Sequence, residues 1–264
     1  MKRLIFVEGV SGTGKSTTAA KLHEALNSSG YQASCHLEGD SDNPIDLCWF
    51  AYLTRSEFQR LILAYPPFAD ALAAASIAEN DYVLVQYQNK QTKLYSPEVY
   101  GYLRDREACY KCAAPIPIDA FTAIFQNRWR RFLNSDHAER DYAVFDGTFL
   151  HHPINDLLRN YDASDEQLFK HMKAILQMIS PLKPVVFYLS SDNVEERLRK
   201  ARQSRGQNAP TPDQIHFWEN RRRCDLLMLE NLPMESHIID VTKDSWDDVT
   251  NRIWSAISGT GREA

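Results

Sequence analysis

Residues 4–22 read LIFVEGVSGTGKSTTAAKL, where an apolar run meets a glycine-rich turn that leads into a helical pattern. The apolar run predicts a buried strand, and the Ala, Lys and Leu of residues 15–28 predict a helix. Glycine takes positive φ at little steric cost, so Gly9, Gly12 and Gly14 allow a sharp turn and close approach to a ligand.

The segment from Gly9 to Ser16 fits G-x-x-x-x-G-K-[S/T], the pattern of a phosphate-binding P-loop. In that motif successive backbone N–H groups surround a phosphate, and the N-terminus of the following helix attracts the same anion. We therefore expect ATP here, with Lys15 catalytic at the β- and γ-phosphates and the Ser16 hydroxyl on Mg²⁺. The residues expected to contact the nucleotide are Gly9, Ser11, Gly12, Thr13, Gly14, Lys15, Ser16 and Thr17.

Two stretches, FVEGVSGTGKSTTAAKL (6–22) and VVFYLSSDNVEERLRKARQSR (185–205), resemble nucleoside and nucleotide kinases of the P-loop superfamily, especially thymidylate and deoxynucleoside kinases. The second stretch is similar to their fourth strand, helix and arginine-bearing lid. After the third strand this chain has Asp146-Gly147-Thr148 where thymidylate kinases have Asp-Arg-Tyr or Asp-Arg-Ser, and it looks more like poorly characterised bacterial P-loop proteins related to those kinases. The resemblance implies phosphoryl transfer from ATP·Mg²⁺ to a small molecule.

Continuous apolar runs predict the strands of a parallel sheet, and helical patterns follow most of them. The predicted strands are 3–9, 31–39, 142–147, 184–191 and 236–242; later helices are predicted at 193–204 and 245–257. We expect one P-loop kinase-like α/β domain over residues 1–264. The resemblance implies the strand order 2-3-1-4-5, with helices on both faces.

The long segment 40–141 between the second and third strands is expected to form a cap. It predicts helices broken at Pro66-Pro67, a β-hairpin over 82–95 with Asn89-Lys90 at its turn, and a helix over 119–133. Such an insertion lies at the carboxyl ends of parallel strands, where ligands bind, so we expect it to bind the acceptor. A purely structural helical cap is the alternative.

Acidic residues at two predicted strand ends are candidates for the chemistry. Asp146 is expected to hold Mg²⁺ or accept a proton, the alternative being a turn or N-cap aspartate. Resemblance to deoxynucleoside kinases makes Glu38 the candidate general base, with Asp40 as a substrate contact; a surface turn explains both equally well. Glu8 is expected to have a structural role.

Arginines cluster around the polar stretch 206–214, and we interpret 197–223 as a lid. Arg202 and Arg205 are expected to close over the transferring phosphate and stabilise its charge. The alternative is a solvated helix face with ion pairs four residues apart, Glu195 to Arg199 and Glu196 to Lys200.

Two further groups of basic residues are candidate substrate contacts. Arg128 is expected to bind an acidic group of the acceptor, although an ordinary amphipathic helix explains it as well. His151 and His152 follow the third strand and are candidates to touch substrate.

Composition limits the classes of partner. A net charge of −5 argues against nucleic acid, and no run approaches the about 18 apolar residues of a membrane span. Five cysteines fit a reducing cytoplasm better than a disulfide framework, and Cys109 and Cys112 are expected to be ordinary thiols and not zinc ligands. The resemblance also implies a homodimer.

The function expected from these features is transfer of the γ-phosphate of ATP to a hydroxyl or phosphate of a nucleoside-like or nucleotide-like molecule. Three alternatives stay open: a kinase for a hydroxylated antibiotic or other metabolite, a polynucleotide end kinase, and a regulatory NTPase switch.

Overall fold

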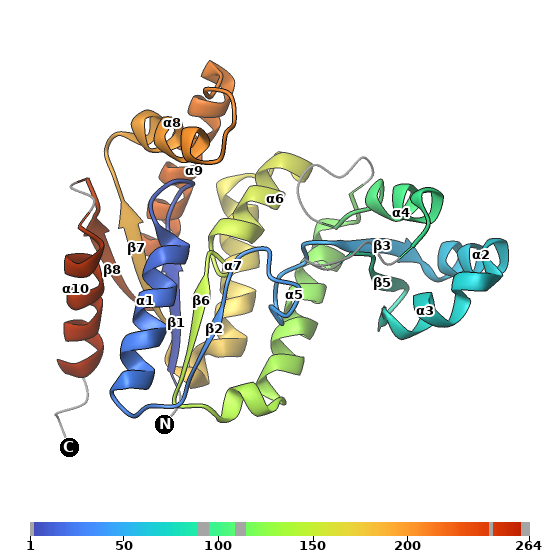
Figure 1. Cartoon of the computed structure of the whole chain (residues 1–264), viewed down its shortest axis with the longest axis horizontal. Helices are drawn as coiled ribbons and strands as arrows, with labels where there is room; N and C mark the ends of the chain where they lie inside the picture. The colour runs from blue at the N-terminus through green and yellow to red at the C-terminus, as the bar shows by residue number, and fades with distance from the viewer. Residues whose placement is uncertain (1–2, 89–94, 109–114, 243–244, 260–264) are drawn as a thin grey trace.

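A computed structural model of the chain describes residues 3–88, 95–108, 115–242 and 245–259 (Figure 1). Its main sheet has five strands, and every neighbouring pair in it is parallel. The strands are β1 (Arg3–Glu8), β2 (Ala33–His36), β6 (Tyr142–Asp146), β7 (Val185–Ser190) and β8 (Glu235–Asp240). The predicted α/β fold with a five-stranded parallel sheet is confirmed.

The strands lie side by side in the order β2-β6-β1-β7-β8. These labels differ from the predicted 2-3-1-4-5 because β3, β4 and β5 belong to a separate sheet and come between β2 and β6 in the chain. Counted within the main sheet alone, the same five strands are the second, third, first, fourth and fifth along the chain. Strand β1 is therefore central, and the loop that follows it opens in the middle of the sheet's carboxyl edge.

Helices cover both faces of this sheet, and the side chains of β1 alternate between the two. Leu4 and Phe6 lie in the larger core, whereas Ile5 and Val7 lie in the smaller one. The larger core is built with α5 (Ile118–Leu133), α6 (His151–Tyr161), α7 (Asp165–Ile179) and α9 (Pro212–Asn231), and the smaller with α1 (Lys15–Ser28) and α10 (Trp246–Gly259). Burial on both faces explains why the strands read as continuous apolar runs.

The remaining helices of the main layer are short or lie at its edge. Helix α8 (Val194–Ser204) packs against α9 beside the loop after β1 (Figure 1), and the 3-10 helices are η2 (Asp136–Glu139) and η3 (Ser180–Leu182). None of the helices in the described ranges has the length and apolarity needed to cross a bilayer.

A second, smaller sheet lies in the cap, to one side of the main sheet (Figure 1). Its antiparallel strands have the order β3-β5-β4, with β3 at Phe50–Thr54, β4 at Ser76–Glu79 and β5 at Tyr82–Gln86. The helices beside it are α2 (Arg55–Ala64), η1 (Pro66–Phe68), α3 (Ala69–Ala74) and α4 (Pro97–Arg104). The break predicted at Pro66-Pro67 is found, because η1 separates α2 from α3.

The predicted hairpin is corrected in part. Strand β5 forms where its first arm was expected, but β5 pairs with β3 and β4, which both precede it in the chain. The predicted turn at Asn89-Lys90 lies outside the described residues, as do Cys109 and Cys112. Helix α5 matches the predicted helix 119–133, and its buried side chains lie in the larger core together with residues of both the main sheet and the cap sheet.

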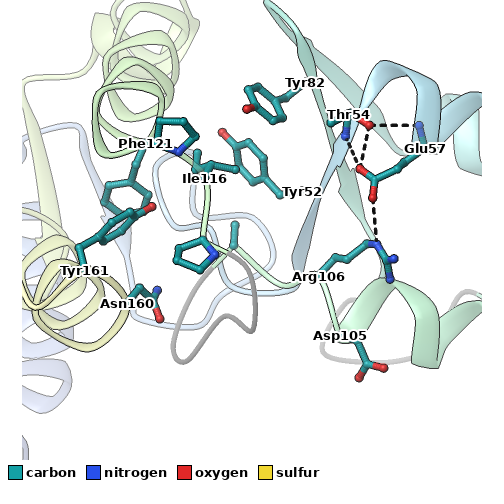
Figure 2. A pocket seen from close by; sticks show the side chains of 13 residues that line it. Tyr52, Thr54, Glu57, Tyr82, Asp105, Arg106, Ile116, Phe121, Asn160 and Tyr161 are labelled. Atoms are coloured by element: carbon teal, nitrogen blue, oxygen red, sulfur yellow. Dashed lines mark hydrogen bonds and ion pairs between the residues drawn. The ribbon is translucent and has the colours of Figure 1, made fainter.

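A cavity of about 480 Å³ lies between the cap sheet and the helices α5 and α6 (Figure 2). A second one, of about 650 Å³, lies over the loop between β1 and α1. Most of the sequence-predicted site residues line the second.

Candidate functional site

The loop from Gly9 to Gly14 joins the central strand to α1, and its glycines are required by both conformation and space. Gly9, Gly12 and Gly14 have φ of 143°, 87° and 84°, a region that favours glycine. A Cβ on Gly12 would lie 2.5 Å from the Arg197 carbonyl oxygen, and one on Gly14 would lie 2.3 Å from the Trp246 ring. Larger residues at these positions would push α8 and α10 away from the loop.

The cavity over this loop receives side chains from elements that are far apart in the sequence. The loop and α1 contribute Ser11, Gly12, Gly14, Lys15, Ser16 and Thr17, all predicted nucleotide contacts. Gly9 and Thr13, which were also predicted, do not line it, and the buried Thr13 hydroxyl donates to the Val10 carbonyl at 2.9 Å. The cationic side chains on its walls come from α1, α6, α8 and the residue that follows α8: Lys15, Arg159, Arg197, Lys200 and Arg205.

Asp146 ends β6 directly beside the start of α1. The Ser16 hydroxyl donates to Asp146 Oδ2 at 2.6 Å, and the Glu38 backbone N–H donates to the same oxygen at 3.4 Å. Oδ1 of Asp146 is buried and has no hydrogen-bond partner among the described residues. Burial raises the pKa of Asp146, while the nearby Lys15 ammonium opposes that rise. The structure thus brings Lys15, Ser16 and Asp146 together, as the sequence predicted.

Lys15 is itself buried within the loop. Its Nζ donates to the Val10 carbonyl at 3.3 Å, and a Cβ on Gly147 would lie 3.3 Å from Lys15 Cε. Gly147 has a φ of 63°, so the turn after Asp146 passes close to the lysine stem without a side chain of its own.

Glu8 has the structural role that was expected of it. Its carboxylate accepts the backbone N–H groups of Phe149, Leu150 and His151 at 2.7, 3.0 and 2.9 Å, and so caps the start of α6. Burial raises the pKa of Glu8 to about 6, although these hydrogen bonds act in the opposite direction. Glu8 therefore fixes the helix that carries His151 and His152.

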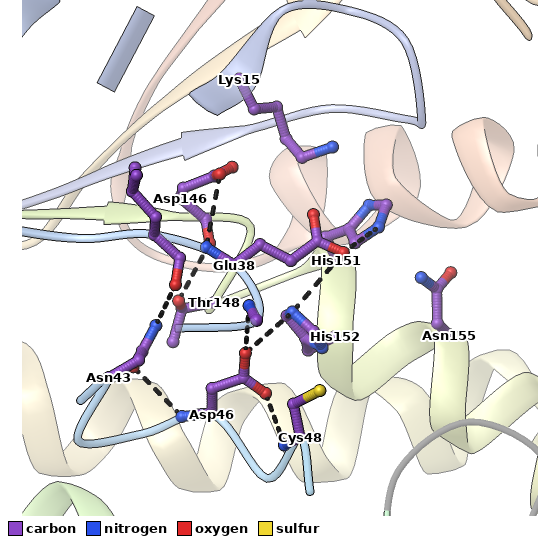
Figure 3. A network of polar contacts seen from close by, with 12 residues as sticks. Lys15, Glu38, Asn43, Asp46, Cys48, Asp146, Thr148, His151, His152 and Asn155 are labelled. Carbon is purple, nitrogen blue, oxygen red and sulfur yellow. Dashed lines mark hydrogen bonds and ion pairs between the residues drawn. The ribbon is translucent and has the colours of Figure 1, made fainter. Parts of the chain in front are cut away.

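Glu38 lines the cavity and lies near both histidines (Figure 3). Its Oε1 is 3.7 Å from His151 Nε2 and 3.8 Å from His152 Nε2, and His152 Nε2 is also 3.6 Å from Asp46 Oδ2. Burial and the charge of Lys15 lower the pKa of His151. Burial also disfavours the charged form of His152, but the carboxylates around it, with Asp46 contributing most, raise its pKa. His152 is therefore the histidine that favours a positive charge here.

Asp46 was missed by sequence reasoning, although it is almost fully buried beside this cluster. Its oxygens accept the backbone N–H groups of Gly39 at 2.8 Å and Cys48 at 2.9 Å (Figure 3). It thereby links the turn after β2 to the start of the cap. Nothing in the segment around it signals this contact, which depends on how the chain returns past β2.

The structure separates the two lid arginines. Arg205 lines the cavity, whereas Arg202 does not, and Arg202 Nε donates to the Asn208 carbonyl at 2.5 Å. The predicted ion pairs on α8 are present, with Glu195–Arg199 at 2.6 Å and Glu196–Lys200 at 2.9 Å. The ion-paired helix face is therefore found, and closure of Arg205 over a phosphate stays a prediction.

The basic residues at the end of the predicted lid hold α9 in place. Arg221 is fully buried; it pairs with Asp225 and donates to Asn155 Oδ1 at 3.0 Å. Burial lowers the pKa of Arg221 to about 10. Arg222 and Arg223 likewise bond to acidic residues of neighbouring segments, at 2.8 and 2.9 Å. These contacts hold α9 against neighbouring segments, and the lid over 197–223 stays a prediction.

Asp40 and Arg128, the predicted substrate contacts, lie outside the cavity. Arg128 Nη2 donates to the Asn43 carbonyl at 3.4 Å, and its guanidinium carbon is 4.7 Å from the Phe50 ring centroid. The Asp40 backbone N–H donates to the Leu37 carbonyl at 3.3 Å, in the turn after β2. The structure does not bring either residue to the loop.

Two tryptophans and an arginine at the cavity were also missed. Trp218 stacks on His151 with ring centroids 5.3 Å apart, and Arg159 lies 4.6 Å over the ring of Phe217. One signal was available, because His151, Asn155 and Arg159 are four residues apart and so share one face of α6. The tryptophans carry no such signal, since Trp218 and Trp246 reach the cavity from distant helices.

Comparisons with known proteins add little to this geometry. No family model matches the chain, and no curated protein matches it. Among solved structures, the YorR protein of Bacillus subtilis, in complex with phosphorylated GDP, matches with a TM-score of 0.48 and 13% identity over 99% of both chains. At this TM-score the likeness supports no inference about this chain.

Proposed function

We propose that this protein is an ATP·Mg²⁺-dependent phosphotransferase that moves the γ-phosphate to a hydroxyl or phosphate of a nucleoside-like or nucleotide-like small molecule. The observation that carries the proposal is the contact between Ser16 and Asp146 at 2.6 Å, beside Lys15 and at the start of α1. A hydroxyl, a buried carboxylate and an ammonium beside a glycine loop are the groups that hold a nucleotide phosphate with its metal.

The residues present fit a magnesium ion. Asp146 Oδ1 is a buried carboxylate oxygen that has no hydrogen-bond partner in the described part of the chain, and the Ser16 hydroxyl is next to it. No group of three or more His, Cys, Asp or Glu side chains in those ranges is arranged to hold a metal. Mg²⁺ is commonly held by one or two protein ligands together with phosphates and water, so Ser16 and Asp146 suffice. The ion would neutralise phosphate charge.

The charged side chains of the cavity take different roles in this proposal. The loop N–H groups and Lys15 bind the phosphates, and Arg205 and Lys200 face the same cavity from α8, where they stabilise charge on the transferred group. Glu38 lines the same cavity near His152 and accepts the proton of the acceptor hydroxyl. The net charge of −5 makes a nucleic-acid acceptor less suitable than a small molecule.

The test is ADP release from ATP·Mg²⁺ with nucleosides, nucleoside monophosphates and hydroxylated antibiotics as acceptors. We expect release that depends on one acceptor class and is lost on chelation of Mg²⁺. Slow release that is the same with every acceptor would instead indicate an NTPase switch. Absence of ATP binding would contradict the proposal altogether.

A further inference from the structure

The cavity between the cap and α6 is separate from the phosphate-binding loop and has different walls (Figure 2). Its volume is about 480 Å³, within the range of about 300–1,000 Å³ that small-molecule sites occupy. One wall is the cap sheet, from which Tyr52 and Tyr82 project, and the other carries Phe121 of α5 and Tyr161 of α6.

The aromatic rings form two facing surfaces. The ring centroids of Tyr52 and Tyr82 are 5.6 Å apart, and those of Phe121 and Tyr161 are 5.7 Å apart. Ile116 lies between the two walls in Figure 2. Aromatic walls favour a flat ring, because a ring stacked on one wall buries one face against it while its other face lies toward Ile116 and the opposite wall.

A buried hydroxyl inside this cavity has no partner. Tyr52 is 8% exposed, and its hydroxyl makes no hydrogen bond to any residue that the structure describes. In Figure 2 its ring is directed from β3 toward the opposite wall. Burial raises the pKa of Tyr52, so the hydroxyl keeps its proton and acts as a donor. An unpaired buried donor carries a free-energy penalty that a ligand acceptor would remove.

The rim of the cavity selects against a strongly charged ligand. Arg106 is the one cation among its lining residues, which also include two carboxylates, those of Glu57 and Asp105. Arg106 Nε is 3.7 Å from Glu57 Oε1, and its guanidinium carbon is 3.8 Å over the Tyr102 ring. A phosphate at this rim would meet more negative than positive charge, whereas an uncharged ligand would not.

We propose that this cavity is a binding site for an uncharged nucleoside or free nucleobase, with its ring between the aromatic walls and an edge acceptor atom on the Tyr52 hydroxyl. A base has a flat π-face for stacking and polar atoms on its edge, which matches the two features of the site. This binding proposal is separate from the proposed function, because a nucleoside could bind in the cap cavity whether or not the protein transfers phosphate. Because α6 supplies Arg159 to one cavity and Tyr161 to the other, the occupant would lie one helix away from the loop.

The experiment is isothermal titration of the full chain, without ATP, with adenosine, guanosine, cytidine, uridine and thymidine. We expect at least one to bind with a submillimolar Kd. Tyr52→Phe removes only the hydroxyl, so it should weaken that Kd about 5- to 20-fold while raising the melting temperature of the free protein. The rise in melting temperature shows that the variant folds.

Two further variants test whether the nucleoside binds in this cavity and not elsewhere on the protein. Tyr95→Phe makes the same change at a buried cap tyrosine that does not line the cavity, and should leave the Kd within about twofold. Lys15→Ala alters the loop cavity and should also leave it unchanged. The proposal is overturned if no nucleoside binds at millimolar concentration, if Tyr52→Phe binds as tightly as the wild type, or if Lys15→Ala abolishes binding.

Discussion

The two cavities differ in the side chains that line them. Around the loop after β1, polar and charged side chains from several elements contact one another, as in the pairs Ser16–Asp146 and Glu38–His152. In the cap cavity the walls are aromatic and one buried hydroxyl, that of Tyr52, has no partner among the described residues. The lining of the first cavity is mainly polar and charged, and the lining of the second is mainly aromatic and apolar apart from its rim.

The difference shows which kind of ligand each cavity would suit. A dense group of cations beside a buried carboxylate suits phosphate and metal, since electrostatic attraction is strong where water is excluded. Aromatic surfaces suit a ring, since dispersion and the hydrophobic effect do not need charge. Variants at each site should therefore change different quantities.

The largest expected effect is that of Lys15→Ala. Loss of the ammonium should lower kcat/KM about 10³-fold, because the positive charge at the phosphates is removed. Steady-state ADP release measures it, with Lys21→Ala as the matched control. Lys21 is exposed and pairs with Asp247 at 2.8 Å, so its loss should leave the rate unchanged. Equal rates for wild type and Lys15→Ala would mean that the loop cavity is not the phosphate site.

Asp146→Asn should lower kcat about 10²-fold and raise the Mg²⁺ concentration needed for half-maximal rate. Stability at neutral pH should change little, because burial already disfavours the charged form of this carboxyl. Titration of the rate with Mg²⁺ and a thermal melt measure both quantities, with Asp40→Asn as control. A large loss of stability with a normal rate would make Asp146 structural.

Glu8 gives a pH dependence of stability with a defined sign. Its pKa rises from 4.5 to about 6 on folding, so the folded state binds the proton more tightly. The contribution of Glu8 is then most favourable below pH 4.5 and falls by about 2 kcal/mol as the pH rises through about 6. Denaturant unfolding of wild type and Glu8→Gln across this range should show the fall in the wild type only. Parallel pH profiles would contradict it.

The smallest expected effect separates the two lid arginines. Arg205→Ala should lower kcat about tenfold because Arg205 faces the loop cavity, whereas Arg202→Ala should change it less than about twofold. The pair is its own control, since the two residues are three apart at the end of α8. The reverse order of effects would mean that α8 is placed differently during turnover.

Particular residues show which parts of the candidate site could be predicted from the sequence. The contiguous segment from Gly9 to Ser16 predicted its loop and helix, because its glycines and lysine act through local backbone geometry. Asp146 was found because it ends an apolar strand. Asp46, Trp218 and Trp246 were missed, and Asp40 and Arg128, predicted as substrate contacts, lie outside the loop cavity, because none of these positions depends on local pattern.

By itself the sequence determined the parallel strands, the loop after the first of them, and the helix that follows. These features follow from hydrophobic periodicity and from the backbone freedom of glycine, which act over a few residues. The order of the strands was inferred from resemblance. The tertiary structure alone decided which distant side chains share a cavity, such as Glu38 with His152 and Tyr52 with Phe121. Those neighbours depend on how whole layers pack, and no spacing along the chain encodes that.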